Sequence, residues 1–594
     1  MNDSVKLHLL TSEGESDITP ERGAGDVKLS QWMRSRGHPL NTRCGGRGLC
    51  DACRVDLVSG TLQRVDTAER VTVLPGEKAV RLRSCEHALV EGEPASLSVP
   101  DKSMMSFEPQ VIADFRLEVP IGKAPLWPAA DEPPRNAERP RVGPPLGAAI
   151  DVGTTTVALL LLNLESGEVL ARTSAFNKQT HLGDDVLTRI NLCMNEAGMI
   201  DRCQDAIVNE TLSPLLAEAM EEANADPGQL VCLVAAGNAT MLHLLVGEDP
   251  SSMGVAPFTA SFLDHRAVRL SSTGFRWPAK HHANAGNGRA EQAAKRDPAL
   301  HLLPGAAAYV GADLTAGIVA TGMRYRPDTC LLVDVGTNGE IILKHGDKLY
   351  GCATAAGPAF EGSKLCNGVR AARGAISHID IARLDPLDLR VEVIGEPPPA
   401  GPDAPNKRAP RLKPIGLCGS AYIDFLAEGA RTGLLESVGR FHPDLAADRL
   451  IDASCHSKCF RVAEGSGKEP ICVTEADVAS LLQAKAAIAA GIVTLLGRVG
   501  LTPADVATLY LAGGFGLHVR IPSAIGSGLL PGLREQQIEL VGNTSLAGAF
   551  MATMDRTVLD EMRAAADEIE IVELNLDPAF EMNYIDQLSL PEPA

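Results

Sequence analysis

The sequence predicts a multidomain fold in which a small α+β domain precedes a larger α/β domain with two lobes. Cysteines and glycines gather in one short loop within the first hundred residues, between segments with strand-like alternation. From Gly147 onward, apolar strands alternate with alanine-rich helical segments, the pattern of α/β proteins. An apolar strand, Asp-Val-Gly-Thr and a second apolar strand occur at 148–162 and again at 331–343, which predicts two similar lobes.

Local composition divides the chain into three parts. Strand-like patterns occur in the first part at 5–10, 54–57 and 96–99. Residues 101–146 hold nine prolines and little periodicity, which is typical of an extended linker. Two polar stretches of the larger domain, 265–298 and 395–414, are predicted to be surface loops. The predicted boundaries are therefore 1–100 for the first domain, 101–146 for the linker and 147–594 for the two-lobed domain.

Charge and hydropathy limit the classes of partner. The chain has 594 residues, 45% of them hydrophobic and 22% charged, which is the balance of a globular protein. A formal net charge of −20 argues against nucleic acid and anionic membrane surfaces as partners. The first residues lack a basic start followed by a long apolar run, and the apolar run 157–162 is far shorter than the roughly 20 residues of a membrane helix. We therefore expect a cytoplasmic protein.

Four cysteines have the arrangement of an iron–sulfur site. Cys44, Cys50 and Cys53 have C-x5-C-x2-C spacing, and Cys85 lies in a distant segment. Iron–sulfur clusters commonly take three thiolates from one loop and a fourth from elsewhere. Structural zinc usually has two close pairs of ligands, so we favour a [2Fe–2S] cluster over zinc or free thiols. Arginines surround the loop at 34, 36, 43, 47 and 54, and would either dock an acidic electron donor or form a solvated basic rim.

The repeated Asp-Val-Gly-Thr turns are candidate phosphate-binding loops. A tight turn between two strands exposes backbone N–H groups, and glycine lets a phosphate approach them. An aspartate at the end of the first strand can hold Mg²⁺ through water and orient an attacking water, and we assign this catalytic role to Asp151 and Asp334. The residues predicted to contact the phosphates are Gly153, Thr154, Thr155, Thr156, Gly336, Thr337, Asn338 and Gly339.

These turns resemble the phosphate loops of the acetate-kinase, sugar-kinase, Hsp70 and actin superfamily of ATPases. The superfamily's adenosine motif matches 509–516, and its two small-residue connecting helices match 311–322 and 542–552. A glycine turn that opens a helix at 416–426 suits a nucleotide contact at a helix N-terminus. The resemblance implies that ATP is also contacted by Gly419, Ser420, Gly513, Gly514, Phe515 and Gly516.

The cysteine loop with the distant Cys85 resembles a [2Fe–2S] ferredoxin domain, and its union with this ATPase resembles the reductive activators of corrinoid proteins. The resemblance rests on CGGRGLCDACRV, AIDVGTTTV, LLVDVGTNGEI, GLCGSAYID and LAGGFG. It implies ATP-driven transfer of an electron through the cluster to a corrinoid protein, whose cobalt returns from Co(II) to Co(I). It also implies Mg²⁺ and a low-potential donor such as a ferredoxin or flavoprotein, and it allows a homodimer.

Other interpretations stay open. In the first alternative the chain activates another low-potential enzyme. In the second it is a kinase with a redox-sensing ferredoxin domain, and in the third it is a plain electron carrier. Cys455, Cys459 and Cys472 with His456 form a weaker candidate metal site, because they lie in a polar loop segment without a second close pair. Asn238 follows an apolar strand and would either line the cleft or cap a helix.

Overall fold

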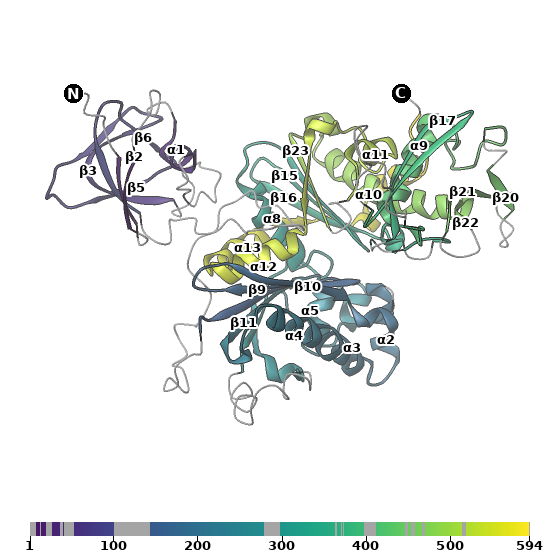
Figure 1. Cartoon of the computed structure of the whole chain (residues 1–594), viewed down its shortest axis with the longest axis horizontal. Helices are drawn as coiled ribbons and strands as arrows, with labels where there is room; N and C mark the ends of the chain where they lie inside the picture. Colours follow the sequence, from purple (N-terminus) through teal and green to yellow (C-terminus); the bar gives the residue numbers. More distant parts are fainter. Residues whose placement is uncertain are drawn as a thin grey trace, which may run out of the picture.

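The computed structural model describes three regions that each contain a large sheet (Figure 1). The described residues are 7–11, 14–18, 27–35, 40, 53–99, 143–183, 185–277, 297–362, 365–369, 371, 374–396, 412–445, 449–452, 458–465, 470–513 and 518–592.

The N-terminal region forms a sheet and a core of its own. Among the described residues, the strands pair in the order β2-β1-β7-β3-β4, and β5 and β6 also pair with β3. Leu9, Trp32, Val55 and Leu97 belong to the core against this sheet. The strands predicted in this region are confirmed with shifted ends. The bounds are β1 Leu7–Thr11, β2 Gly14–Ile18, α1 Leu29–Ser35, β3 Arg54–Arg64, β4 Arg70–Val73, β5 Val80–Arg83, β6 His87–Leu89 and β7 Ala95–Ser98.

The first lobe is built on a sheet of order β10-β9-β8-β11-β13-β12 in the described part of the chain. Strands β8, β9 and β10 form an antiparallel meander, and β11 lies parallel to β8 on its other side. The stretch predicted as a loop at 265–298 begins instead with strand β12, which pairs with β13. The bounds are β8 Leu146–Val152, β9 Thr156–Asn163, β10 Val169–Phe176, α2 Val186–Asn195, α3 Met199–Ile207, α4 Ser213–Glu222, β11 Leu230–Gly237, α5 Ala239–Leu245, β12 Arg266–Arg269 and β13 Ala299–Leu302.

The second lobe repeats this topology. Strands β14, β15 and β16 form an antiparallel meander, and β23 lies parallel to β14, as β11 does to β8. The described sheet has the order β24-β23-β14-β15-β16-β25. The expectation of two similar lobes is therefore confirmed by strand direction as well as by sequence. The bounds are β14 Cys330–Val335, β15 Gly339–His345, β16 Lys348–Thr354, β23 Thr508–Ala512, β24 Ile538–Gly542 and β25 Ile569–Ile571.

Two short sheets and several helices surround the second sheet. The short sheets are β18-β17-β19 and β20-β21-β22. Helix α10 is long and apolar enough to cross a membrane by length and composition alone, but 78% of its most apolar window is buried, as in a core helix. The bounds are β17 Ala375–Leu384, β18 Leu387–Val393, β19 Gly416–Leu417, α9 Gly419–Thr432, β20 Leu450–Asp452, β21 Lys458–Glu464, β22 Pro470–Thr474, α10 Glu475–Arg498, α11 Ile521–Gly526, α13 Thr557–Glu568 and α14 Pro578–Asp586.

Helices α8 (Ala312–Thr321) and α12 (Thr544–Met554) cross between the sheets of the two lobes (Figure 1). Small residues allow the close approach that the sequence predicted. A Cβ on Gly548 would lie 2.6 Å from the Cα of Ala316, and one on Gly317 would lie 3.0 Å from the Oγ1 of Thr544. Because no larger side chain fits at this crossing, the two helices pack closely against one another between the lobes.

Candidate functional site

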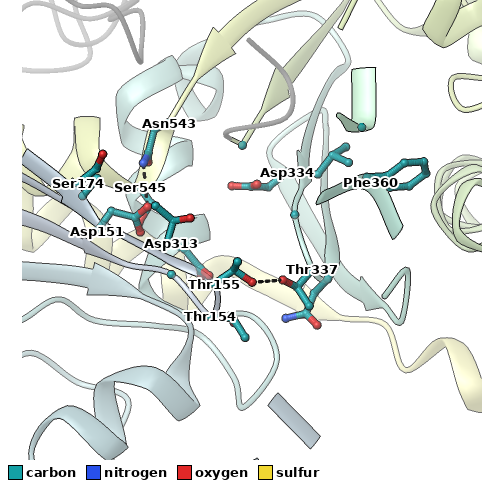
Figure 2. A pocket seen from close by; sticks show the side chains of 18 of the residues that line it. Asp151, Thr154, Thr155, Ser174, Asp313, Asp334, Thr337, Phe360, Asn543 and Ser545 are labelled. Atoms are coloured by element: carbon teal, nitrogen blue, oxygen red, sulfur yellow. Dashed lines mark hydrogen bonds between the residues drawn. The ribbon is translucent and has the colours of Figure 1, made fainter. Parts of the chain in front are cut away.

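A cleft of about 660 Å³ opens between the sheets of the two lobes, where strand ends from both lobes meet the starts of helices. Figure 2 shows Asp151 and Thr155 of the first lobe facing Asp334 and Thr337 of the second. The predicted residues that line this cleft are Asp151, Gly153, Thr154, Thr155, Thr156, Asp334, Gly336, Thr337, Asn338, Gly419, Ser420 and Gly513. The tertiary structure therefore brings together both repeated turns and three of the other predicted nucleotide contacts.

The first cleft loop, residues 153–155, joins β8 to β9. It requires glycine at 153, because a Cβ there would collide with the carbonyl oxygen of Thr156. The hydroxyl of Thr154 accepts a hydrogen bond from Nδ2 of Asn238 at 3.0 Å. Asn238 also caps α5 by accepting from the backbone N–H of Met241, so it both caps a helix and lines the cleft, the two alternatives left open by the sequence.

The second cleft loop, residues 336–338, occupies the matching position between β14 and β15. The N–H of Gly336 donates to the carbonyl of Asn338 at 2.9 Å, which closes a tight turn. The hydroxyls of Thr337 and Thr155 lie 3.0 Å apart, so the two loops meet across the cleft (Figure 2). Gly339 is not among the cleft-lining residues. A Cβ on it would lie 2.6 Å from Ile488 of α10, so this glycine serves packing behind the loop.

Among the described residues, four carboxyl groups line the cleft: those of Asp151, Asp313, Asp334 and Glu340. Burial, together with the nearby carboxyl groups of Asp313 and Asp151, raises the pKa of Asp334 to about 8. Burial likewise raises the pKa of Asp313 to about 7 and that of Glu340 well above its ordinary value. Crowded, desolvated carboxyl groups favour binding of a proton or a cation, because either relieves their mutual repulsion.

Hydrogen bonds set Asp151 apart from the other three carboxyl groups. Asn543 Nδ2 donates to its Oδ2 at 2.8 Å, and the Ser545 hydroxyl donates to its Oδ1 at 2.6 Å. These bonds lower its pKa while burial raises it more strongly. Both donors stand at the start of α12, so the crossing helix fixes this carboxylate (Figure 2).

Sequence reasoning missed several cleft residues. Asp313 stands in the first turn of α8, inside a segment interpreted only as a connecting helix, and Asn543 and Ser545 stand in the equivalent segment at α12. The available signal was a polar or acidic side chain within three residues of the glycine that precedes an otherwise apolar helix. Glu340 on β15 was also missed; it lies directly opposite Asp334 on the neighbouring strand β14.

The adenosine-binding candidates are only partly described. Gly419 opens α9 so closely against Phe360 that a Cβ would collide with its carbonyl oxygen. The hydroxyl of Ser420 donates to the carbonyl of Ser377 at 2.8 Å, so it anchors the helix start. Gly513 directly follows β23 and has a φ of +92°. Gly514, Phe515 and Gly516 lie outside the described residues.

We expect Gly513→Ala to weaken ATP binding about ten-fold or more, the size of a 1.4 kcal/mol loss. A Cβ on Gly513 would lie 2.7 Å from Oδ1 of Asp334 and would collide with the carbonyl oxygen of Val335, so the second cleft loop has to shift. Gly500→Ala is the matched control, because Gly500 also has a positive φ (+73°) but has open space around its Cβ position. Calorimetric titration with Mg·ATP measures both; equal affinities in the two variants would contradict the prediction.

Two cysteine thiols of the N-terminal sheet region lie together. Cys53 Sγ and Cys85 Sγ are 3.3 Å apart, and both side chains are buried. Cys44 and Cys50, the other two predicted ligands, lie outside the described residues. The two segments that the sequence spacing separates are therefore adjacent in the fold, at a distance that suits two thiolates on one small metal cluster.

The weaker candidate metal site is not assembled by the described residues. Cys455 and His456 lie outside them, while Cys459 and Cys472 are buried on the neighbouring strands β21 and β22. Burial raises the pKa of the Cys459 thiol, and its hydrogen bond with Cys472 raises it further. In the part of the chain that the structure describes, no three His, Cys, Asp or Glu side chains are grouped so as to hold a metal ion.

Comparison with known proteins places the chain in a family. The model of the RACo middle region matches residues 146–326, and that of the C-terminal, ASKHA domain of RACo matches residues 328–594. The corrinoid activation enzyme RamQ of Eubacterium limosum is 27% identical over 627 aligned residues, covering 96% of this chain and 97% of that protein. The [Co(II) methylated amine-specific corrinoid protein] reductase of Methanosarcina barkeri is 29% identical over 295 residues, 47% of this chain and 49% of that one.

A solved structure agrees with these sequence matches along the chain. It is a reductive activator for corrinoid, iron–sulfur protein, with a TM-score of 0.68 and 25% identity, and the match covers 99% of this chain and 98% of that one. The two-lobed domain with its paired cleft loops is thus the ASKHA, or actin-like, ATPase domain that the sequence predicted. The chain belongs to the RACo family, whose compared members are activators or reductases of corrinoid proteins.

Proposed function

We propose that the chain is an ATP-dependent enzyme that reductively activates a corrinoid protein, returning its cobalt from Co(II) to Co(I) with one electron from a low-potential donor. The observation that carries the proposal is the match to a corrinoid activation enzyme along nearly the whole chain, so that the cleft and the thiol pair occur within one matched protein. The donor would be a ferredoxin or a flavoprotein, and the setting the cytoplasm.

The N-terminal region is proposed to be a ferredoxin-type domain that holds a [2Fe–2S] cluster. The buried Cys53 and Cys85 thiols, 3.3 Å apart, fit two of its four ligands, and Cys44 and Cys50 supply the other two by their spacing. When bound, such a cluster supplies one-electron redox chemistry. The protein's contribution is to bury the thiolates of Cys53 and Cys85 away from water.

The cleft is proposed to bind Mg·ATP with its phosphates between the two cleft loops. Mg²⁺ is commonly held by one or two carboxylates together with waters and phosphate oxygens, rather than by a cage of protein ligands. The raised pKa of Asp334 and Asp313 fits this, because a nearby cation allows those carboxyl groups to ionise. Asp151, already hydrogen-bonded to Asn543 and Ser545, would hold the ion or orient the attacking water.

A movement of the two lobes is the proposed link between ATP and electron transfer. The Thr155 and Thr337 hydroxyls meet directly, so a phosphate between the loops has to part them and replace their contact. An uphill reduction by two or three tenfold steps costs about 3–4 kcal/mol, which a two-state movement of the lobes can supply. A homodimer remains compatible with this scheme.

The test is anaerobic absorbance of Co(I) in a candidate corrinoid protein mixed with the purified chain and a reductant, with and without ATP. We expect Co(I) to accumulate only with hydrolysable ATP. The same Co(I) fraction without nucleotide would contradict the proposal and leave an electron carrier with a regulatory nucleotide domain. Phosphorylation of a small substrate without cobalt reduction would identify a kinase instead.

A further inference from the structure

We propose that Arg189 and Asn177 are positioning residues of the nucleotide site: they hold the backbone of the first cleft loop so that its amide N–H groups face the polyphosphate. The inference deepens the proposed function and rests on the part of it that assigns ATP to the cleft. Neither residue stands in a sequence motif that predicts such a role.

Arg189 reaches the loop from behind. It lies on α2 and is fully buried, with 0% of its surface exposed. Its Nη2 donates to the carbonyl of Thr154 at 2.6 Å, while Nε donates to the carbonyl of Gly183 and Nη1 to Oε1 of Gln179, both at 2.9 Å. The rigid guanidinium is therefore fixed at three points, and one of its donors fixes the loop.

Asn177 holds the loop on either side of that bond. It follows β10 and is also fully buried. Its Nδ2 donates to the carbonyl of Gly153 at 3.0 Å, and its backbone N–H donates to the carbonyl of Thr155 at 2.8 Å. Three successive carbonyl groups of the first cleft loop are thus bound by two buried residues.

Because the peptide bond is planar, the hydrogen bonds that hold these carbonyl groups also orient the N–H groups of the loop for binding an anion. In a trans peptide, the N–H of one residue points opposite to the carbonyl of the residue before it. Residues 153–156 line the cleft, whereas Asn177 and Arg189 do not. When the carbonyls of Gly153 and Thr154 are held on the side of the protein interior, the N–H groups of Thr154 and Thr155 are directed toward the cleft.

Fixed donors of this kind stabilise negative charge without having to reorganise. The choice of arginine is informative, because burying a guanidinium is costly and an apolar side chain would fill the same space with less loss of hydration. Unlike an apolar side chain, Arg189 fixes the orientation of one peptide group of the loop, because it binds the carbonyl of Thr154. The ligand class that benefits is the phosphate chain of a nucleotide, and the nucleoside end gains nothing.

The experiment compares affinities of adenosine and Mg·ATP by calorimetry in wild type and Arg189→Met. We expect the affinity for ATP to fall about ten-fold or more, the size of one lost charged hydrogen bond, and that for adenosine to change less than about two-fold. Arg189→Lys should recover part of the ATP affinity. The matched control is Thr173→Val, which removes a buried bond to the carbonyl of Leu215 in the same lobe without touching the loop.

Asn177→Asp is the second variant, and it serves if Arg189→Met does not fold. It keeps the shape of the side chain but replaces the donor to Gly153 by an acceptor, so the same selective loss of ATP affinity is expected. Equal losses for adenosine and ATP, or no loss, would overturn the inference, as would a wild-type protein that does not prefer ATP to adenosine. Because the assay contains no corrinoid protein, failure of Co(I) formation with normal nucleotide selectivity counts against the proposed function alone.

Discussion

Cys85→Ala is expected to remove the iron and sulfide of the protein and to abolish electron delivery to cobalt, while Mg·ATP binds with wild-type affinity. A [2Fe–2S] cluster needs all four thiolates, and Cys85 is the proposed ligand whose sulfur lies 3.3 Å from that of Cys53. Nucleotide binding survives because the N-terminal sheet has a core separate from those of the two lobes. Iron and sulfide analysis measures loss of the cluster, visible absorbance of the corrinoid protein measures electron delivery to cobalt, and titration with Mg·ATP measures nucleotide affinity.

The control is Cys232→Ala. Cys232 is equally buried, but it stands in β11 of the first lobe, so this variant should keep its iron. Anaerobic metal analysis of the wild type that finds zinc and no iron would refute the cluster assignment. Retention of two irons per chain in Cys85→Ala would show that the fourth ligand lies elsewhere.

Asp334→Asn is expected to lower ATP hydrolysis at least about a hundred-fold, the usual contribution of a group that positions a proton or water in the transition state. The amide has the shape of the carboxyl group but carries no charge, so it supports Mg²⁺ poorly and cannot accept a proton. The absorbance of the cluster should be unchanged, because Asp334 ends β14 of the second lobe. Hydrolysis at the wild-type rate would show that the active site has been misplaced.

The same substitution should stabilise the nucleotide-free protein, and only at high pH. Folding raises the pKa of Asp334 from 3.8 to about 8, so between these values the folded state binds more protons than the unfolded state. The free energy of unfolding therefore falls as the pH rises through this window. Asparagine does not titrate, so its advantage over aspartate grows from pH 5 to pH 8.

Thermal unfolding of both proteins without nucleotide, at pH 5 and pH 8, measures this difference. A higher melting temperature for Asp334→Asn at pH 8, together with its loss of hydrolysis, would show that the carboxyl group is kept for chemistry at the expense of stability. A melting temperature that does not depend on the substitution at pH 8 would contradict the buried, crowded environment found for this group.

The sequence by itself determined the elements that carry the chemistry. Asp151 and Asp334 each follow an apolar strand and precede a glycine turn, so local periodicity and turn chemistry place them at strand ends. The repeat of that pattern predicts two lobes, and the parallel placement of β11 beside β8 and of β23 beside β14 confirms them. The cysteine spacing likewise predicts that Cys85 joins the loop cysteines, and the described thiol of Cys53 does lie beside it.

Only the tertiary structure decided which side chains surround these turns. The hydrogen bond from Asn543 to Asp151 joins residues almost four hundred positions apart, and the bond from Arg189 to the Thr154 carbonyl depends on where α2 packs. Gly339 belongs to the same turn pattern as Gly336, but it packs against α10 instead of facing the cleft. The physical reason is that periodicity and turn chemistry act over a few residues, whereas burial, pKa and hydrogen bonding at the cleft depend on neighbours that the fold assembles from distant segments.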